Sequence, residues 1–81
     1  MNIRIQNFPP DITVEAIRDF LGACDEITEI ILTDAGNSDD VVAVLKLSTS
    51  HTGAEGIAEF IDGRFYQDRR LSAQVLTLLN D

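Results

Sequence analysis

The amino-acid sequence predicts an α+β domain in which two helices pack on one face of a four-stranded antiparallel sheet. The chain has 81 residues, which is enough for one hydrophobic core and a single domain spanning residues 1–81. Apolar residues recur at every second position in four segments and at helical spacing in two. The segments follow one another as β-α-β-β-α-β, the order of a ferredoxin-like sandwich.

The first strand and first helix are separated by two prolines. Residues 3–8 alternate between polar and apolar types, which is typical of a half-buried strand. Pro9 and Pro10 end this strand, because proline donates no backbone hydrogen bond. Thr13 is a suitable N-cap. The helix after it is predicted by an apolar stripe at helical spacing, formed by Ile17, Phe20, Leu21 and Cys24.

Two further strands follow. Ile27, Ile30 and Leu32 mark the second strand, and the turn-forming residues 34–40 end it. Residues 41–47 are rich in β-branched types and predict a third, central strand.

A polar run over residues 48–53 leads into the second predicted helix, whose apolar residues are Ala54, Ile57, Ala58 and Ile61. Gly56 lies inside this helix and costs it about 1 kcal/mol relative to alanine. Asp62 and Gly63 end the helix. The fourth strand is predicted by the alternating residues Leu71, Ala73 and Val75.

Composition limits the function classes. The formal net charge of −8 and the pI near 4.3 are unfavourable for general nucleic-acid binding, which depends on Lys and Arg at phosphates. Cys24 is the only cysteine, so neither an intramolecular disulfide nor a four-cysteine metal site can form. No signal peptide or membrane-spanning run is visible. We expect a monomer in the cytoplasm, or in the nucleus of a eukaryotic cell.

The chemistry-bearing residues do not predict an enzyme. His51 is the only histidine and is expected in a solvated loop, whereas Cys24 is expected in the core of the first helix. Asp39 and Asp40 precede a strand as turn residues do. We therefore expect no catalytic residues, no metal and no cofactor.

Two stretches carry a resemblance to the RNA recognition motif family. Residues 3–9 resemble the family's second ribonucleoprotein motif, ending in Asn7, Phe8 and Pro9. Residues 54–64 and 69–75 are similar to its second helix, its Asp-Gly turn and its last strand, at the same spacing. The resemblance covers nearly the whole chain and implies the same fold and the binding of single-stranded RNA.

The chain departs from the family where bases usually stack. Residues 40–47 occupy the position of the first ribonucleoprotein motif. There Asp40 replaces a basic residue, and Val42 and Val44 replace two aromatic residues. Arg4 stands where the third aromatic residue is usual. Stacking contributes about 1–3 kcal/mol per base, so we expect RNA binding to be weak and its mode non-standard.

The face of the sheet opposite the helices is the predicted RNA surface. Alternation predicts a mildly basic face on an acidic body, with Arg64 and Arg69 in a loop beside that face. An arginine can stack on an unpaired base and pair with phosphate at once. The alternative is an ordinary solvated sheet face. The predicted RNA-binding residues are Arg4, Gln6, Val42, Val44, Lys46, Arg70 and Gln74.

The same face has a small apolar part, comprising Ile31, Val42 and Val44. It is expected either to contact a protein or to be covered by the leucine-rich tail, residues 76–79.

A second function remains open. Residues 63–69 resemble the Arg-x-Phe loop of U2AF-homology variants of this fold, which bind a tryptophan-containing peptide behind the sheet. By that resemblance Arg64 and Tyr66 flank the peptide, and Glu15 and Asp19 attract its basic residues. In ordinary family members the aromatic residue of this loop only fills the core, and this is the alternative interpretation here.

Overall fold

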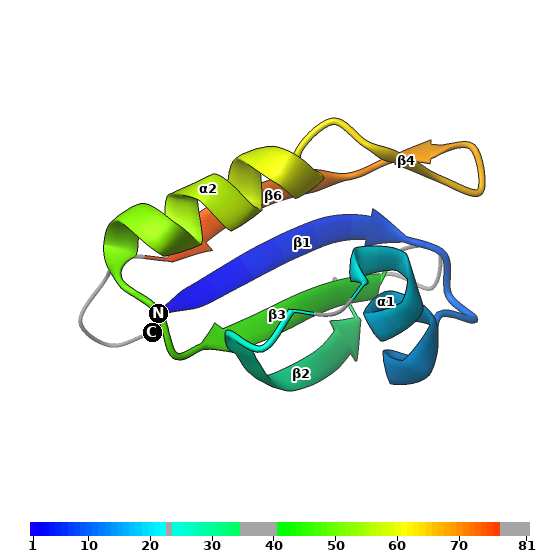
Figure 1. The fold of residues 1–81 in the computed structure, drawn as a ribbon. Helices are drawn as coiled ribbons and strands as arrows, with labels where there is room; N and C mark the ends of the chain where they lie inside the picture. The colour runs from blue at the N-terminus through cyan, green and yellow to red at the C-terminus, as the bar shows by residue number, and fades with distance from the viewer. Residues whose placement is uncertain (23, 35–40, 77–81) are drawn as a thin grey trace.

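The structure, a computed structural model, describes residues 1–22, 24–34 and 41–76. Four strands form one antiparallel sheet in the order β2-β3-β1-β6, with both helices on one face (Figure 1). This confirms the predicted ferredoxin-like α+β fold. The strands are β1 (Asn2–Phe8), β2 (Ile27–Asp34), β3 (Val41–Leu47) and β6 (Ser72–Leu76), and the helices are α1 (Val14–Leu21) and α2 (His51–Ile61). The predicted turn residues 35–40 and the tail residues 77–79 lie outside the described residues.

Helix α1 is shorter than its apolar stripe predicts. The Thr13 hydroxyl accepts a hydrogen bond from the Ala16 amide at 3.1 Å and caps the helix as expected. Gly22 then takes a φ of 77° and its amide donates to the carbonyl of Arg18, so the helix ends one turn early. Cys24 therefore lies between α1 and β2, and its predicted place in the helix is wrong.

Helix α2 begins earlier than predicted. The Ser50 hydroxyl accepts from the Gly53 amide at 3.2 Å and acts as the N-cap. His51 is consequently the first helical residue, not a loop residue. Its Nε2 lies 3.0 Å from Oε1 of Glu55, one helical turn onward.

The hydrophobic core lies between the helices and the sheet, as the strand patterns predict. Its fully buried residues include Ile3, Ile5, Leu45 and Ile61. Phe8 is also fully buried, although strict alternation along β1 would turn it to the opposite face. The pairing of β1 with β3 is irregular between Ile5 and Phe8, where Asn7 has a φ of 83°. This bulge redirects Phe8 into the core.

A short hairpin that the sequence patterns did not predict joins α2 to β6. Strand β4 (Phe65–Tyr66) pairs with β5 (Arg69–Arg70), and the hairpin extends beyond the end of α2 (Figure 1). Its two-residue turn consists of Gln67 and Asp68, both with positive φ, at 50° and 65°. No helix among the described residues is long and apolar enough to cross a membrane.

Candidate nucleic-acid interface

The strand register places Arg4 in the middle of the open sheet face. Arg4 pairs with Val44 of β3 on one side and with Gln74 of β6 on the other, and Ile31 of β2 pairs with Val44. These four residues form a row across all four strands. Arg4 and Gln74 are exposed, and Val44 is half-buried. Within the described part of the chain, the Arg4 side chain makes no hydrogen bond or salt bridge.

In the neighbouring row, one residue that was predicted to contact RNA is buried. Gln6 pairs with Ser72, and Val42 pairs with Thr33. Val42 is only 4% exposed although it lies outside the core cluster on the helix face. Alternation predicts the face of a residue but not how far other groups cover it. The prediction that Val42 offers an open contact surface is therefore wrong, whereas Ile31 remains 38% exposed.

Lys46 lies in the third row, where it pairs with Asn2 and with Glu29 along the strands. Its Nζ is 3.7 Å from Oε1 of Glu29, and both side chains are about half exposed. Such an exposed pair stabilises the fold little, but it offsets the positive charge that Lys46 would present to a phosphate.

Arg70 was predicted on the open face of the four-stranded sheet, but it belongs to strand β5 of the hairpin and not to that sheet. Its guanidinium lies beside Gly63, where a Cβ would stand 3.5 Å from Nη2. The Asn7 side-chain amide donates to the Arg70 carbonyl at 3.0 Å. Nη1 of Arg69 donates to Oδ1 of Asn7 and to the Phe8 carbonyl, each at 3.5 Å. Through these side-chain hydrogen bonds, Asn7 joins the end of β1 to the hairpin.

Arg64 lies on the helix side of the sheet and not beside the open face as predicted. Its guanidinium carbon is 4.7 Å from the ring centre of Phe20 in α1 and 4.6 Å from that of Phe60 in α2. Two cation–π contacts therefore hold this side chain.

Tyr66 packs against the core. Its ring makes edge contacts with Phe8 and Phe20 at centroid distances of 5.7 and 5.3 Å. This packing fits the core interpretation of the aromatic residue. Glu15 and Asp19 are exposed on α1.

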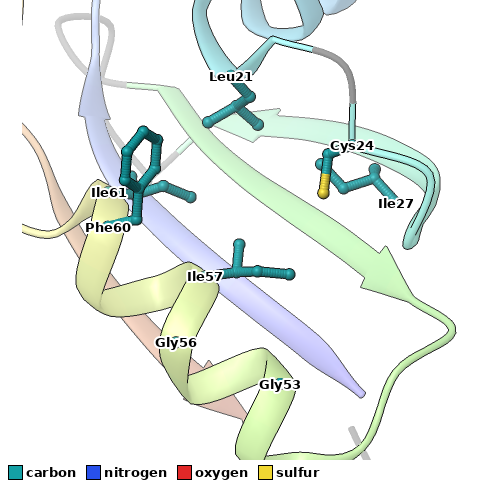
Figure 2. Close-up of a pocket in the computed structure, with 8 residues that line it drawn as sticks. All are labelled: Leu21, Cys24, Ile27, Gly53, Gly56, Ile57, Phe60 and Ile61. Atoms are coloured by element: carbon teal, nitrogen blue, oxygen red, sulfur yellow. The ribbon is translucent and has the colours of Figure 1, made fainter.

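An apolar pocket of about 350 Å³ lies between the end of α1, the start of β2 and α2 (Figure 2). Sequence patterns did not predict it, because its walls come from three separate elements. The Cys24 thiol at its edge donates to Oε2 of Glu26 at 3.3 Å. Burial and this hydrogen bond raise the pKa of the Cys24 thiol above its usual value. Across the described residues, no group of three or more His, Cys, Asp or Glu is placed to hold a metal ion.

This chain is similar to known proteins in structure and not in sequence. No family model matches the sequence, and no curated protein is similar to it. Solved structures do match. The Pes4 RRM3 structure has a TM-score of 0.78 and 20% identity over 94% of this chain and 90% of that one.

Two further similar structures are of RNA-binding domains or of a domain with bound RNA. The three N-terminal RNA binding domains of the yeast splicing factor Prp24 match with a TM-score of 0.76 and 24% identity, over 96% of this chain and 33% of that one. The Rna15 RRM with bound RNA (GU) matches with a TM-score of 0.73 and 14% identity, over 95% and 83%. The chain therefore has the fold of the RNA recognition motif.

Proposed function

We propose that this chain is an RNA-binding module that holds single-stranded RNA weakly on the open face of its sheet, centred on Arg4. The observation that carries the proposal is the row in which Arg4 lies exposed between Val44 and Gln74. The fold supports it, since one of the similar structures, the Rna15 RRM, contains bound RNA.

Each side chain of the row has a role in this proposal. The Arg4 guanidinium stacks on an unpaired base or pairs with a phosphate. Gln74 and, in the next row, the half-buried Gln6 offer amide groups that can hydrogen-bond base edges. Val44 and Ile31 supply apolar contact without the face of an aromatic ring.

Weak affinity follows from what surrounds the row. No described residue of the four-stranded sheet is aromatic on the open face, so the stacking energy of about 1–3 kcal/mol per base is missing. Glu29 offsets the charge of Lys46, and the net charge of −8 opposes the approach of RNA.

The proposal describes a binding module without cofactor or catalytic residues. The alternative of peptide recognition by Arg64 and Tyr66 has less support, because Phe8, Phe20 and Phe60 already contact these two side chains.

An amide chemical-shift titration with a pool of mixed-sequence RNA octamers tests the proposal. Shifts are expected at Arg4, Val44 and Gln74, with much smaller shifts on the helices. Arg4→Ala should abolish them. Arg18→Ala is the matched control, since it removes the same charge from an exposed position on α1. Strand amides that stay unshifted, or equal effects of the two variants, would contradict the proposal.

A further inference from the structure

The hairpin between α2 and β6 carries an exposed aromatic residue (Figure 1). Phe65 is 65% exposed, more than any other large apolar residue that the structure describes. It is not packed against the hydrophobic core, unlike Phe8, Phe20 and Tyr66. Within the described part of the chain, its ring contacts no other ring and no cation. The packing of the described residues therefore gives no reason for an aromatic residue at this position.

Phe65 lies on the same side of the molecule as the open sheet face. Along β6, Ser72 and Gln74 are exposed on that face, whereas Leu71 before them is buried in the core. Arg70 precedes Leu71 and is exposed, so alternation assigns it to the side of the open face. Arg70 pairs with Phe65 in the hairpin, and directly paired residues project to the same side of a two-stranded ribbon.

The neighbours of Phe65 along the chain point the other way. Tyr66 contacts the rings of Phe8 and Phe20. Arg64 also contacts the ring of Phe20, on the helix side. Because successive side chains of a strand project to opposite faces, Phe65 between these two residues turns away from the helices. Two separate patterns thus give the same side for Phe65.

The hairpin is also the most basic segment of the chain. Residues 63–71 contain three of its six Lys and Arg residues and one acidic residue, Asp68. The Arg70 side chain makes no hydrogen bond or salt bridge within the described structure. Its guanidinium lies beside Gly63, two residues before Phe65. An exposed ring next to an exposed arginine suits a nucleotide, which combines a flat base with a negative phosphate.

We propose that Phe65 is a base-stacking platform of the RNA surface and that Arg70 contacts the phosphate beside the stacked base. The inference rests on the proposed RNA binding and adds to it an aromatic contact outside the four-stranded sheet. The RNA then runs from Arg4 and Gln74 across Ser72 onto the hairpin. Four residues of chain separate Gln74 from Arg70 and span at most about 14 Å, so one short single strand reaches both.

Replacement of the ring tests the platform. Phe65→Leu keeps an apolar side chain but removes the stacking surface, and it should lower the affinity for the RNA octamer pool at least about fivefold. Phe60→Leu is the matched control, because Phe60 is similarly exposed, at 60%, and contacts Arg64 on the helix side. This control should leave the affinity unchanged. Circular dichroism confirms that both variants are folded.

A tryptophan reporter gives a second readout. The chain contains no tryptophan, so Phe65→Trp introduces a single indole and keeps an aromatic ring at the site. The RNA octamers should quench its fluorescence at the concentrations that shift the strand amides, and a ribose-phosphate octamer without bases should not. Phe60→Trp should respond to neither. Equal quenching at the two positions, or equal quenching by the octamer without bases, would refute stacking on residue 65.

The role of Arg70 has its own test. Arg70→Ala should weaken RNA binding and make the slope of log affinity against log salt shallower by about 0.7. Arg18→Ala removes the same charge from α1 and should leave the slope unchanged. A slope that Arg70→Ala does not alter would exclude the phosphate contact.

The outcomes separate this inference from the proposed function. If RNA shifts the amides of Arg4, Val44 and Gln74 but Phe65→Leu binds as the Phe60→Leu control does, the sheet binds RNA and the hairpin platform is wrong. If RNA shifts the hairpin amides and leaves the sheet row unshifted, the platform stands and the site centred on Arg4 is wrong. A titration without shifts at either place overturns both.

Discussion

Lys46 and Glu29 form a salt bridge of 3.7 Å across neighbouring strands of the open sheet face. Among the described residues of that sheet face, Arg4 is therefore the exposed cation whose charge is not offset by a neighbouring carboxylate. A phosphate that approaches Lys46 must compete with the Glu29 carboxylate.

Replacing Glu29 by glutamine should strengthen RNA binding. The change removes the competing carboxylate and keeps the side-chain volume. We expect affinity to rise by roughly two- to fivefold, equivalent to the about 0.5–1 kcal/mol of an exposed ion pair. Isothermal titration with a mixed RNA octamer at 50 mM salt measures the gain. Glu15→Gln removes the same charge from α1 and should change affinity less; an equal gain would mean that only net charge matters.

Salt should weaken the complex in proportion to the phosphates that are contacted. For single strands the slope of log affinity against log salt is about −0.7 per phosphate. With two or three contacts from Arg4, Lys46 and Arg70, raising salt from about 50 to 200 mM should lower affinity roughly 7- to 18-fold. Lys46→Ala should make the slope shallower by about 0.7. An affinity that does not depend on salt would exclude these contacts.

The burial of Val42 changes how a stacking platform can be restored. Val44 is half-buried in the central row beside Arg4, whereas Val42 is nearly inaccessible. Val44→Phe alone should therefore raise affinity for single-stranded RNA by about 1–3 kcal/mol for the one base that it stacks. Val42→Phe should instead destabilise the fold, since extra volume at a buried site costs about 1–3 kcal/mol. Thermal unfolding and RNA titration of both variants check this, and a gain from Val42→Phe would contradict it.

Local sequence patterns predicted most of this fold, because each strand buries one face and the order of elements leaves few topologies. The patterns failed at positions where the backbone conformation of a single residue determines the local structure. The positive φ of Gly22 shortens α1 and frees Cys24 to line a pocket, and the positive φ of Asn7 turns Phe8 inward. The hairpin escaped prediction because Gln67 and Asp68 are not the residues usual in its turn.

The candidate sites were less predictable than the fold. Alternation assigned Arg4, Val44 and Gln74 to one face, and the register showed that they lie in one row. The alternation of polar and apolar residues could not show that Val42 is covered or that Arg64 lies toward the helices, because both facts depend on contacts between distant segments. The pocket joins residues of α1, β2 and α2, and no local pattern indicates it.

The hairpin turn should accept a more favourable sequence. Gln67 and Asp68 both lie in the left-handed region, where a two-residue hairpin turn favours Asn followed by Gly. Gln67→Asn with Asp68→Gly should raise the free energy of unfolding by about 1 kcal/mol, measured by urea denaturation. Asp11→Gly, at an exposed position without positive φ, should give no gain. A less stable double variant would mean that the turn residues make contacts beyond the hairpin.

Arg64 should matter for stability and not for RNA. Its guanidinium contacts the rings of Phe20 in α1 and Phe60 in α2 and so links the two helices. Arg64 is half-buried, and each cation–π contact contributes at least the about 0.5–1 kcal/mol found at exposed sites. Arg64→Ala should therefore lower the free energy of unfolding by about 1–2 kcal/mol. Arg18→Ala, the matched control on α1, should cost less than about 0.5 kcal/mol.

A double-mutant cycle isolates the contact. Phe60→Leu keeps an apolar side chain at that position but removes the ring, and its cost should shrink when Arg64 is already alanine. Urea denaturation of the four proteins gives the coupling energy, and RNA titration should give the same affinity for all four because this contact lies behind the sheet. If the two substitutions lower the free energy of unfolding additively, the guanidinium and the ring do not interact in solution. An Arg64→Ala variant that loses RNA binding while remaining folded would place the RNA contact on the helix side and contradict the assignment of Arg4.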